Sequence, residues 1–514
     1  MSTQTTTDLR QLASDVLNRA LKAGATDAEA VVYEGDEFSA LVHLGQVETL
    51  KESGSRAVGL RVFLNSGNAQ RTASTSSSDF STESIARLVE GAITLAKITS
   101  EDPFAGLPEP HEFGQLDNDL HLYFDDVNEM PPAERIEIAR RTEAAALAYD
   151  TRIQNSRGGD FDTATSHKIM MNSRGFVGEY RRSYCGFSAS PIAHDEKGGM
   201  QRNYWFSNAR TVKKLEDPEE IGREAARRTL QRLGARQVKT QKAPVVFSAE
   251  LSASIIGNIF DAANGDAIYR NASFFSGMLG EQVAGENITV IDDGTLVFDG
   301  IGGFGTRPFD GEGLPTRRTV LVERGILKNY VMNTYTARKL NMKSTGNASR
   351  GLAGNPGIGA GNFYLEAGAL TPEQIIGDIK NGLYVTETMG HGINLVTGDY
   401  SQGASGMWIE NGILKNYVTN TYTARKLGLK STGNASRGLA GNPGIGAGNF
   451  FLEPGQCTPE QLLADVKTGL YVTETMGFGV NLVTGDYSQG ASGLWIENGE
   501  LAYPVEEITI AGNL

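Results

Sequence analysis

Cysteine and histidine are scarce in this sequence. Its 514 residues include two cysteines, Cys185 and Cys457, and six histidines. Two cysteines cannot build a disulfide framework and match no metal-binding spacing, so a reducing, cytoplasmic location is expected. Zinc takes three or four ligands in tetrahedral order. Because no local spacing of histidines supplies such a set, we predict that this chain holds no metal of its own.

The best local pair of metal-ligating residue types is Glu387 with His391, four residues apart. Glycines on both sides of His391 favour a turn rather than the helix that would bring the two side chains together. A second copy of this segment, described below, keeps Glu474 but has Phe478 in place of the histidine. We therefore interpret His391 as a surface residue of a loop.

Excess positive charge and long apolar runs are also missing. Lys and Arg number 47 against 61 Asp and Glu, which gives a net charge of −14. Proteins bind nucleic acids and anionic membrane surfaces through basic patches, so neither is an expected partner. No stretch reaches the roughly 18 apolar residues of a membrane span. The first seven residues lack a basic region followed by an apolar run, so no signal peptide is expected.

Glycine, by contrast, is abundant at 62 residues, and much of it lies in a segment that occurs twice. Copy one is residues 325–411, copy two is residues 412–498, and the two differ at only fifteen of 87 positions. About half of the differences roughly conserve volume, as at Ile375/Leu462, and cores tolerate such exchanges. Two long copies are too few for a solenoid. We interpret them as a tandem duplication of one supersecondary block within a larger domain.

Hydrophobic periodicity predicts an α+β fold. The first half reads as an N-terminal α/β domain with antiparallel strands, and the second as a mainly-β domain. The polar segment 234–242 suggests a boundary, giving domains 1–235 and 236–514. Predicted helices are 8–23, 82–98, 132–149, 217–233 and 249–263; predicted strands include 28–34, 38–44, 47–52 and 57–64, with a hairpin turn at Gly45–Gln46.

Five motifs, in order along nearly the whole chain, carry a family resemblance. Together they resemble the TldD/PmbA family, and the segment Gly398–Gly412 is similar to its PmbA (TldE) branch rather than to TldD. So many ordered motifs make the resemblance specific. The motifs are Asp292–Thr295, Phe309–Thr316, Ser344–Asn347, Asn394–Ser401 and Pro504–Asn513.

The resemblance implies a subunit of a cytoplasmic zinc peptidase. In the family, TldD carries a His-Glu-X-X-X-His helix that holds zinc, and TldE pairs with it to close a chamber where unfolded peptide is cleaved. Here Gly257 and Ala262 stand where the histidines would be, and Asn258 where the glutamate would be. Glycine and alanine have no donor atom and asparagine does not titrate, so neither the ligands nor the general base are present. The zinc is expected in a TldD-like partner.

Candidate peptide-binding residues come from the polar segment 398–406 and its repeat. Asp399, Tyr400 and Ser401 could face a peptide, and the flanking strands could pair with it in a β-sheet. Asp486 and Tyr487 are the equivalents in copy two. A hairpin turn that packs for structural reasons explains the segment equally well.

Two rival functions stay open. One is a self-sufficient metallopeptidase with unusual ligands, and the other is a free-standing peptide-binding or scaffold protein with no peptidase partner. The resemblance also implies a single copy of the repeated block. Since an extra strand would leave an unpaired sheet edge, only one copy should occupy the family position. We expect copy two there, because it leads directly into Pro504–Asn513.

Overall fold

The computed structural model divides into two compact units, Met1–Gly448 and Asn449–Leu514, and each is described by itself. The described residues are 8–194, 200–233, 245–389, 393–398, 400, 403–410, 413–417, 435–436, 444–445, 468–476, 486–497 and 500–513. Helices and strands are mixed along unit 1, which confirms the α+β class. The predicted boundary near residue 235 falls outside these ranges and stays a prediction.

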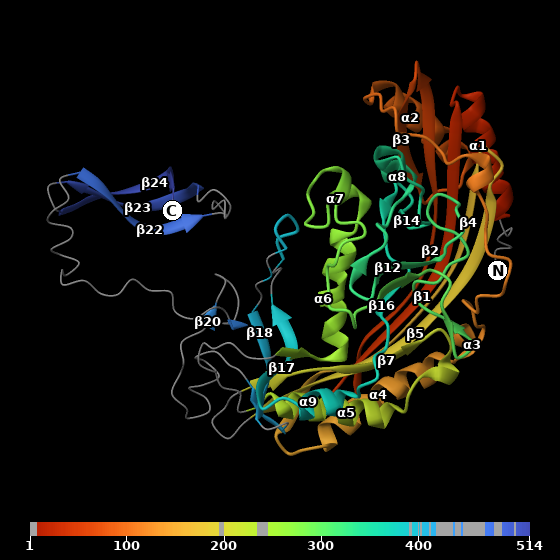
Figure 1. Cartoon of the computed structure of the whole chain (residues 1–514). Helices are drawn as coiled ribbons and strands as arrows, with labels where there is room; N and C mark the ends of the chain where they lie inside the picture. The colour runs from red at the N-terminus through yellow and green to blue at the C-terminus, as the bar shows by residue number, and fades with distance from the viewer. Residues whose placement is uncertain are drawn as a thin grey trace. The chain divides into compact units, whose positions relative to one another are not determined.

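A long antiparallel sheet of seven strands forms the first half of unit 1 (Figure 1). The strand order is β3-β2-β1-β4-β5-β6, and β7 also pairs with β5. Leu44 and Gly45 join β1 to β2, and their positive φ angles of 48° and 77° suit a tight hairpin turn. The bounds are β1 Asp27–His43, β2 Gln46–Ser66, β3 Ala69–Ser77, β4 Ile153–Asn172, β5 Val177–His194, β6 Met200–Arg202 and β7 Trp205–Ala209.

Two strands of this sheet were each expected as two shorter ones. The segments 28–34 and 38–44 join in β1, because Gly35–Glu37 stays paired with Ser53–Ser55 of β2 and with Ala164–Ser166 of β4. Pairing on both sides keeps the backbone extended through residues of low strand propensity. The segments 47–52 and 57–64 join in β2, where residues 53–56 pair with β1, and the turn lies one residue earlier than predicted.

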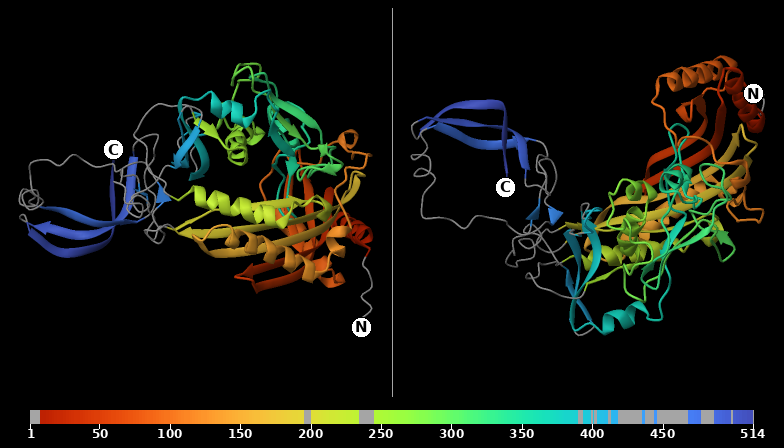
Figure 2. Two further views of the ribbon diagram at one scale, coloured as in Figure 1. Left: turned by 90° about the horizontal axis from the view of Figure 1, so that it is seen from below. Right: turned by 45° about the horizontal axis from the view of Figure 1, so that its top comes forward.

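Four helices cover one face of this sheet (Figure 2). α1 and α2 pack on a cluster that includes Val32 and Leu60, and α4 and α5 pack on one that includes Phe161 and Phe187. α2 begins and ends at its predicted residues, and the other three lie within two residues of theirs. The bounds are α1 Leu9–Lys22, α2 Thr82–Ile98, α4 Pro132–Ala148 and α5 Pro218–Gln231, with the short α3 at Asp126–Glu129.

The C-terminal half of unit 1 lies against the opposite face of the sheet. Phe309 is 1% exposed, and its ring meets those of Phe176 and Tyr180 at centroid distances of 5.1 and 5.2 Å. A β-carbon added to Gly59 of β2 would come within 1.9 Å of the Leu352 carbonyl oxygen. Because glycine has no β-carbon, the main chain of Leu352 in the C-terminal half can lie directly against β2 at this position.

Two four-stranded sheets dominate this C-terminal half. One has the order β13-β12-β9-β16, and the other has the order β19-β18-β17-β8, in which β8 is parallel to β17. The helix predicted at 249–263 is confirmed as α6. The bounds are β8 Val245–Phe247, α6 Ala249–Ala262, α7 Gly265–Tyr269, β9 Val290–Asp293, β10 Val297–Phe298, β11 Ile301–Gly302, β12 Arg318–Glu323, β13 Ile326–Leu327, α8 Thr334–Leu340, β14 Ala348–Ser349, β15 Gly357–Ile358, β16 Asn362–Leu365, α9 Pro372–Gly377, β17 Asn381–Met389, β18 Gly403–Glu410, β19 Ile413–Tyr417, β20 Ala435–Ser436 and β21 Gly444–Ile445.

Copy one, not copy two, supplies the strands beside β8. β17 and β18 both belong to copy one, and the Ser248 N–H donates to the Val385 oxygen at 2.9 Å. The matching strands of copy two, β22 (Thr468–Met476) and β23 (Asp486–Glu497), form a separate sheet in unit 2 with β24 (Glu500–Asn513). The expectation that copy two would take this position is wrong. β13 and β16 of copy one pair with β12 and β9, so β17 reaches β8 through a shorter connection than β22 would need.

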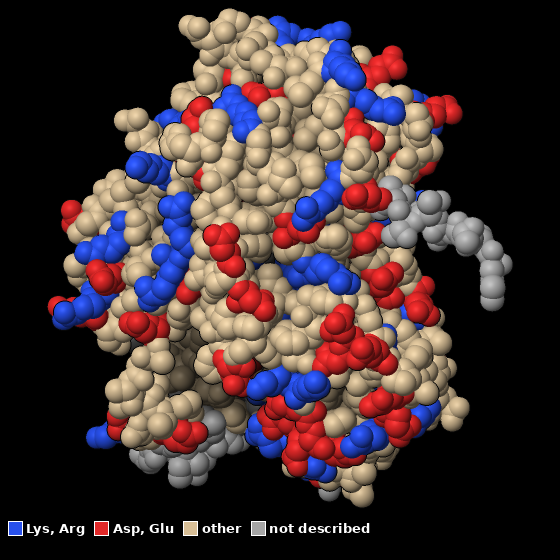
Figure 3. All heavy atoms as spheres, turned by 90° about the vertical axis from the view of Figure 1, so that its right-hand side faces the viewer, with Lys and Arg blue, Asp and Glu red and all other residues tan. Residues whose placement is uncertain are grey.

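Charges of both signs are interspersed on the face of the molecule that Figure 3 shows. Lys and Arg side chains alternate there with Asp and Glu side chains, in keeping with the many surface ion pairs, such as Arg10 with Glu179 and Arg141 with Glu219. Among the described residues, none of the helices has the length and apolar character of a membrane span.

Candidate functional site

Helix α6 carries the three positions that the resemblance matches to zinc ligands and base, Gly257, Asn258 and Ala262. The Asn258 amide is half-buried and donates to the Ser254 carbonyl oxygen, one turn earlier, at 3.1 Å. A β-carbon at Gly257 would meet nothing within 4 Å. Ala262 is 0% exposed within the hydrophobic core. Of the two positions matched to histidine ligands, Gly257 therefore has open space beside it, whereas Ala262 is enclosed by packed side chains.

The residues of α6 do not fit a zinc ion. Two of the three positions have no donor atom, and the third has an amide that is already bonded to its own helix. Within the part of the chain that the structure describes, no three His, Cys, Asp or Glu side chains are grouped closely enough to hold a metal ion. The metal content of the purified chain stays a prediction to be measured.

Neighbouring elements fix the position of α6. Glu250, in its first turn, forms an ion pair with Arg228 of α5 at 2.9 Å. Near its end, the ring of Phe260 packs edge-on against Phe363 of β16 at a centroid distance of 5.3 Å. The helix thus keeps a defined place between the N-terminal helical layer and the C-terminal sheets, although it carries no metal ligands.

In the polar segment after β17, the described residues 393–398 form a tight turn. The main-chain oxygen of Asn394 accepts a hydrogen bond from the Gly398 N–H at 2.8 Å. Tyr400 forms an isolated antiparallel bridge with Ile393, and its side chain is 42% exposed. Partial burial raises the pKa of the Tyr400 phenol. Tyr400 is therefore a neutral, partly exposed aromatic group three residues before the start of β18.

The other predicted peptide-binding residues are placed differently. Asp399 and Ser401 lie outside the described residues. Asp486 and Tyr487 begin β23 in unit 2, where they pair with Asn513 and Gly512 of β24. The part of the segment from Gly403 onward, expected to be loop, is strand β18 instead. The peptide-binding role of all these residues stays a prediction.

Two buried carboxylates of the motif Phe309–Thr316 come together in a way that sequence reasoning missed. Asp310 is 1% exposed and accepts main-chain N–H groups of Glu312, Leu314 and Ala348 at 2.8 to 3.1 Å. Burial, with the charge of Glu312, raises the pKa of Asp310 to about 7. Because its hydrogen bonds go to the backbone of two segments, Asp310 organises the motif rather than facing a substrate.

A buried ionic cluster lies where the N-terminal sheet meets the C-terminal half. It consists of Glu29, Arg61 and Arg350, whose side chains are 0%, 4% and 1% exposed. One carboxylate oxygen of Glu29 accepts the Arg61 Nε–H at 3.1 Å and also contacts the Arg350 guanidinium. The other oxygen has no hydrogen-bond partner among the described residues. Nothing in the spacing of these three residues, spread over 321 positions, pointed to this contact.

A cavity of about 500 Å³ opens beside this cluster. Arg61 and Glu312 lie among its lining residues, and its aromatic surface comes from Phe104, Tyr269 and Tyr335. The Tyr335 hydroxyl donates to Asp102 at 2.8 Å; burial and this hydrogen bond raise the pKa of Tyr335 to about 12. Carboxylates of Glu101, Asp102 and Asp266 also line the cavity.

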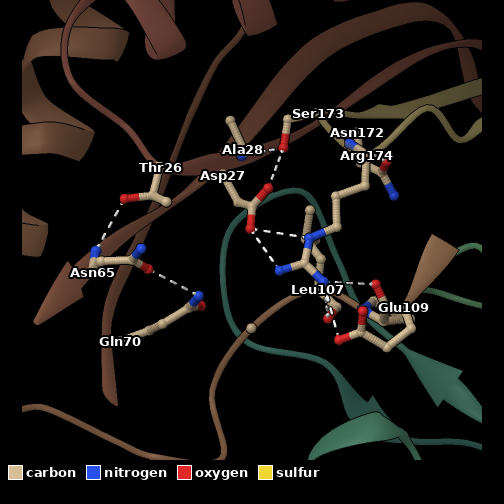
Figure 4. Close-up of polar contacts among 12 residues, drawn as sticks. Thr26, Asp27, Ala28, Asn65, Gln70, Leu107, Glu109, Asn172, Ser173 and Arg174 are labelled. Carbon is tan, nitrogen blue, oxygen red and sulfur yellow. Dashed lines mark hydrogen bonds and ion pairs between the residues drawn. The ribbon is translucent and has the colours of Figure 1, made fainter. Parts of the chain in front are cut away.

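One wall of the cavity is the segment 99–106, and Figure 4 shows how the chain just beyond it is held. Asp27 binds the Arg174 guanidinium at 2.8 Å, and Arg174 in turn reaches the Leu107 carbonyl oxygen and the Glu109 carboxylate. Arg338 of α8 donates to the same Leu107 oxygen at 2.7 Å. Arginines from both halves of unit 1 therefore fix this wall.

Comparisons with known proteins give a consistent family. The model of the PmbA/TldA metallopeptidase domain 1 matches residues 28–96, that of the central domain residues 125–233, and that of the C-terminal domain residues 240–413 and again 407–514. Metalloprotease PmbA of Escherichia coli O157:H7 is 35% identical over 81% of this chain and 89% of its own length. The Metalloprotease PmbA homolog of Haemophilus influenzae is 33% identical over 82% and 89%. The crystal structure of TldE from Thermococcus kodakarensis shares the fold, with a TM-score of 0.69 at 22% identity over 85% of this chain and 97% of its own.

Proposed function

The chain belongs to the PmbA/TldD metallopeptidase family, and from this premise we propose that it is a TldE-like subunit of a cytoplasmic zinc peptidase complex. It holds no metal itself and pairs with a TldD-like subunit that carries the zinc. Its own task is to bind unfolded peptide and to complete the chamber in which the partner cleaves it.

The donor set of α6 carries this proposal. The helix stands in the place that the resemblance assigns to the zinc helix, yet it offers Gly257, Asn258 and Ala262. These three residues cannot supply the two imidazole ligands and the carboxylate base that zinc peptidase chemistry needs. Full burial of Ala262 and the bond from Asn258 back to Ser254 further indicate a helix adapted to packing.

The proposal of a tandem duplication rests on separate support. The C-terminal-domain model matches the chain twice, over 240–413 and 407–514. β17 pairs with β18 from Asn381↔Glu410 onward, and β22 pairs with β23 from Thr468↔Glu497 onward, in the same register. Both copies therefore encode the same local hairpin, as expected of one duplicated block.

The decisive experiment compares the chain alone with the chain co-expressed with a TldD-like subunit from the same source. We expect the chain alone to retain well under one zinc per molecule after dialysis against a weak chelator, and to leave an unfolded test peptide intact. The co-expressed pair should co-elute and cleave that peptide. The matched control is a partner whose zinc-helix histidines are replaced by alanine, which should co-elute without cleaving.

Each rival predicts a different result. A self-sufficient metallopeptidase would retain about one zinc per chain and cleave the peptide alone. A free-standing peptide-binding protein would bind the peptide but elute separately from the TldD-like subunit at micromolar concentrations. Either result would replace the present proposal.

A further inference from the structure

The cavity of about 500 Å³ beside the buried ionic cluster is lined by both halves of unit 1. Arg61 and Phe63 of β2 and Thr72 of β3 come from the N-terminal half, and Tyr269 of α7 and Tyr335 of α8 come from the C-terminal half. Phe63 pairs directly with Thr72 in the sheet. Paired residues project to the same face of a sheet, as do residues two apart in one strand, so Arg61, Phe63 and Thr72 share one face.

Arg61 and Thr72 bring unused hydrogen-bond donors to this cavity. A guanidinium has five N–H donors. In Arg61 only Nε–H forms a hydrogen bond within the described residues, to Glu29 at 3.1 Å, and Nη2 lies 3.1 Å from the same oxygen without forming one. The Thr72 hydroxyl is also buried without a hydrogen-bond partner among the described residues. Because the Arg61 side chain is only 4% exposed, an acceptor bound in the cavity would satisfy donors that bulk water barely reaches.

The carboxylates of the lining, by contrast, have donors or cations of their own. Glu312 accepts the Thr334 N–H at 2.8 Å, and burial raises the pKa of Glu312, which favours its neutral form. The other contacts are Asp102 with the Tyr335 hydroxyl at 2.8 Å, Glu101 with Arg71 at 2.9 Å and Asp266 with Arg270 at 3.0 Å. The buried lining groups that lack a hydrogen bond within the described residues are thus donors, and they favour an anionic ligand.

Aromatic rings of Phe104, Tyr269 and Tyr335 give the cavity an apolar surface. The Tyr335 ring meets those of Phe104 and Tyr269 at centroid distances of 6.5 and 6.3 Å. The Lys339 ammonium lies 4.4 Å from the Phe104 ring centre, 5.4 Å from that of Tyr269 and 5.3 Å from that of Tyr335. Since a cation of the chain itself already contacts these rings, they suit an apolar group of a ligand better than a second cation.

We propose that this cavity binds the C-terminal end of a short peptide. Arg61 and Thr72 donate to its α-carboxylate, and the three rings contact an apolar C-terminal side chain. The planar fork of arginine matches a carboxylate, and a cavity of this volume is within the range of roughly 300–1,000 Å³ that holds small ligands. This inference rests on the proposed peptide-handling function and names the substrate class, which is peptides with a free carboxyl end rather than internal segments.

The test uses the full chain without a TldD-like subunit and follows binding by isothermal titration calorimetry. The dipeptide Ala-Phe is compared with its C-terminal amide, with free phenylalanine and with the amide of Ala-Lys. We expect saturable binding of one Ala-Phe per chain. The Ala-Phe amide should bind at least roughly tenfold more weakly, because it lacks the charge that the donors recognise. If Ala-Phe does not bind while the co-expressed pair still co-elutes and cleaves, this inference fails and the proposed function stands.

Variants of the lining locate the site. Thr72→Val keeps the shape of the side chain and breaks no hydrogen bond within the described residues, so the fold should persist while Ala-Phe binds roughly threefold more weakly or worse. Arg61→Gln should weaken binding by roughly tenfold or more, with Arg350 still facing Glu29. The matched control is Thr49→Val, the same exchange near the other end of β2 and outside the lining, which should leave the affinity unchanged.

Four results would overturn the proposal. Equal binding of the Ala-Phe amide would show that the carboxylate is not recognised, and unchanged affinity of the Thr72→Val variant would place any binding elsewhere. Tighter binding of the Ala-Lys amide or of free phenylalanine than of Ala-Phe would assign the cavity to cations or to amino acids. No binding of Ala-Phe up to about 10 mM would leave the cavity without this ligand.

Discussion

Replacing Arg350 by methionine tests the ionic cluster and the choice between the two copies in one experiment. The Arg350 guanidinium contacts a carboxylate oxygen of Glu29, and both side chains are almost fully buried. Methionine keeps most of the apolar stem and removes the charge. Glu29 is then left with Arg61 as its partner in the cluster, and with one oxygen that already lacks a hydrogen bond.

The expected loss of stability can be estimated in two ways. Two unit charges about 4 Å apart attract by about 4 kcal/mol at an effective dielectric constant of about 20. Removal of one partner from a buried ion pair typically costs about 3–5 kcal/mol. That range is an upper bound here, because Arg61 still compensates the charge of Glu29. For a unit of this size, such a loss lowers the thermal unfolding midpoint by roughly 3–5 °C.

The chain supplies its own control in Arg437, which stands at the equivalent position of copy two and lies outside the described residues. Thermal unfolding followed by circular dichroism should show the large shift for Arg350→Met and a shift within about 1 °C for Arg437→Met, as for most surface substitutions. Equal shifts in the two variants, or a larger one for Arg437→Met, would refute the assignment of copy one to this place in the fold.

Three further predictions follow from buried groups. Ala262→His should destabilise the fold by about 1–3 kcal/mol through overpacking, whereas Gly257→His, placed in open space, should be tolerated; urea unfolding compares them. Phe309→Ala should cost about 3–5 kcal/mol in the same assay, because it removes a ring packed between the two halves of unit 1. Burial, with the charge of Asp162, raises the pKa of Asp160 to about 6, so the folded state retains a proton that the unfolded state loses between about pH 4 and 6. This carboxyl therefore lowers stability as pH rises through that window, and Asp160→Asn should raise the unfolding midpoint more at pH 7.5 than at pH 4.5; an equal gain at both would contradict it.

Local signals in the sequence were sufficient for the five helices of 14 or more residues, but not for the shorter α3, α7, α8 and α9. α2 is bounded as its apolar pattern predicts, because Ser81 caps its start and the periodicity ends at Ile98. At the start of α1 the sequence offers both Thr7 and Asp8 as N-caps, and in the structure the Asp8 carboxylate accepts the Arg10 and Gln11 N–H groups. Both residues are good N-caps, so only the backbone geometry decides between them.

Strand lengths and the buried charges depend on partners far along the chain. Gly35 reads as a strand break, yet β2 and β4 hold it extended from both sides. Asp310 and Glu312 belong to a recognisable motif, but only the fold shows that the carboxylate of Asp310 binds the backbone of residue 348. Tertiary contacts of this kind leave no periodic trace in a single sequence.

The two copies of the repeated block are too similar for the sequence alone to show which of them pairs with β8. The segment Val245–Phe247 and the segment Glu500–Asn513 each occur once in the sequence, whereas the hairpin between them in the family order occurs twice. A hairpin has two outer edges, and the strands that cover them are β8 on one side and β24 on the other. The chain has one β8 and one β24 but two hairpins, and therefore four outer edges. Any arrangement leaves two of these edges that must pair with a substitute strand or stay unpaired. In this structure the first hairpin has β8 and the second has β24, and β19 serves as the substitute strand beside Met407–Glu410 of β18.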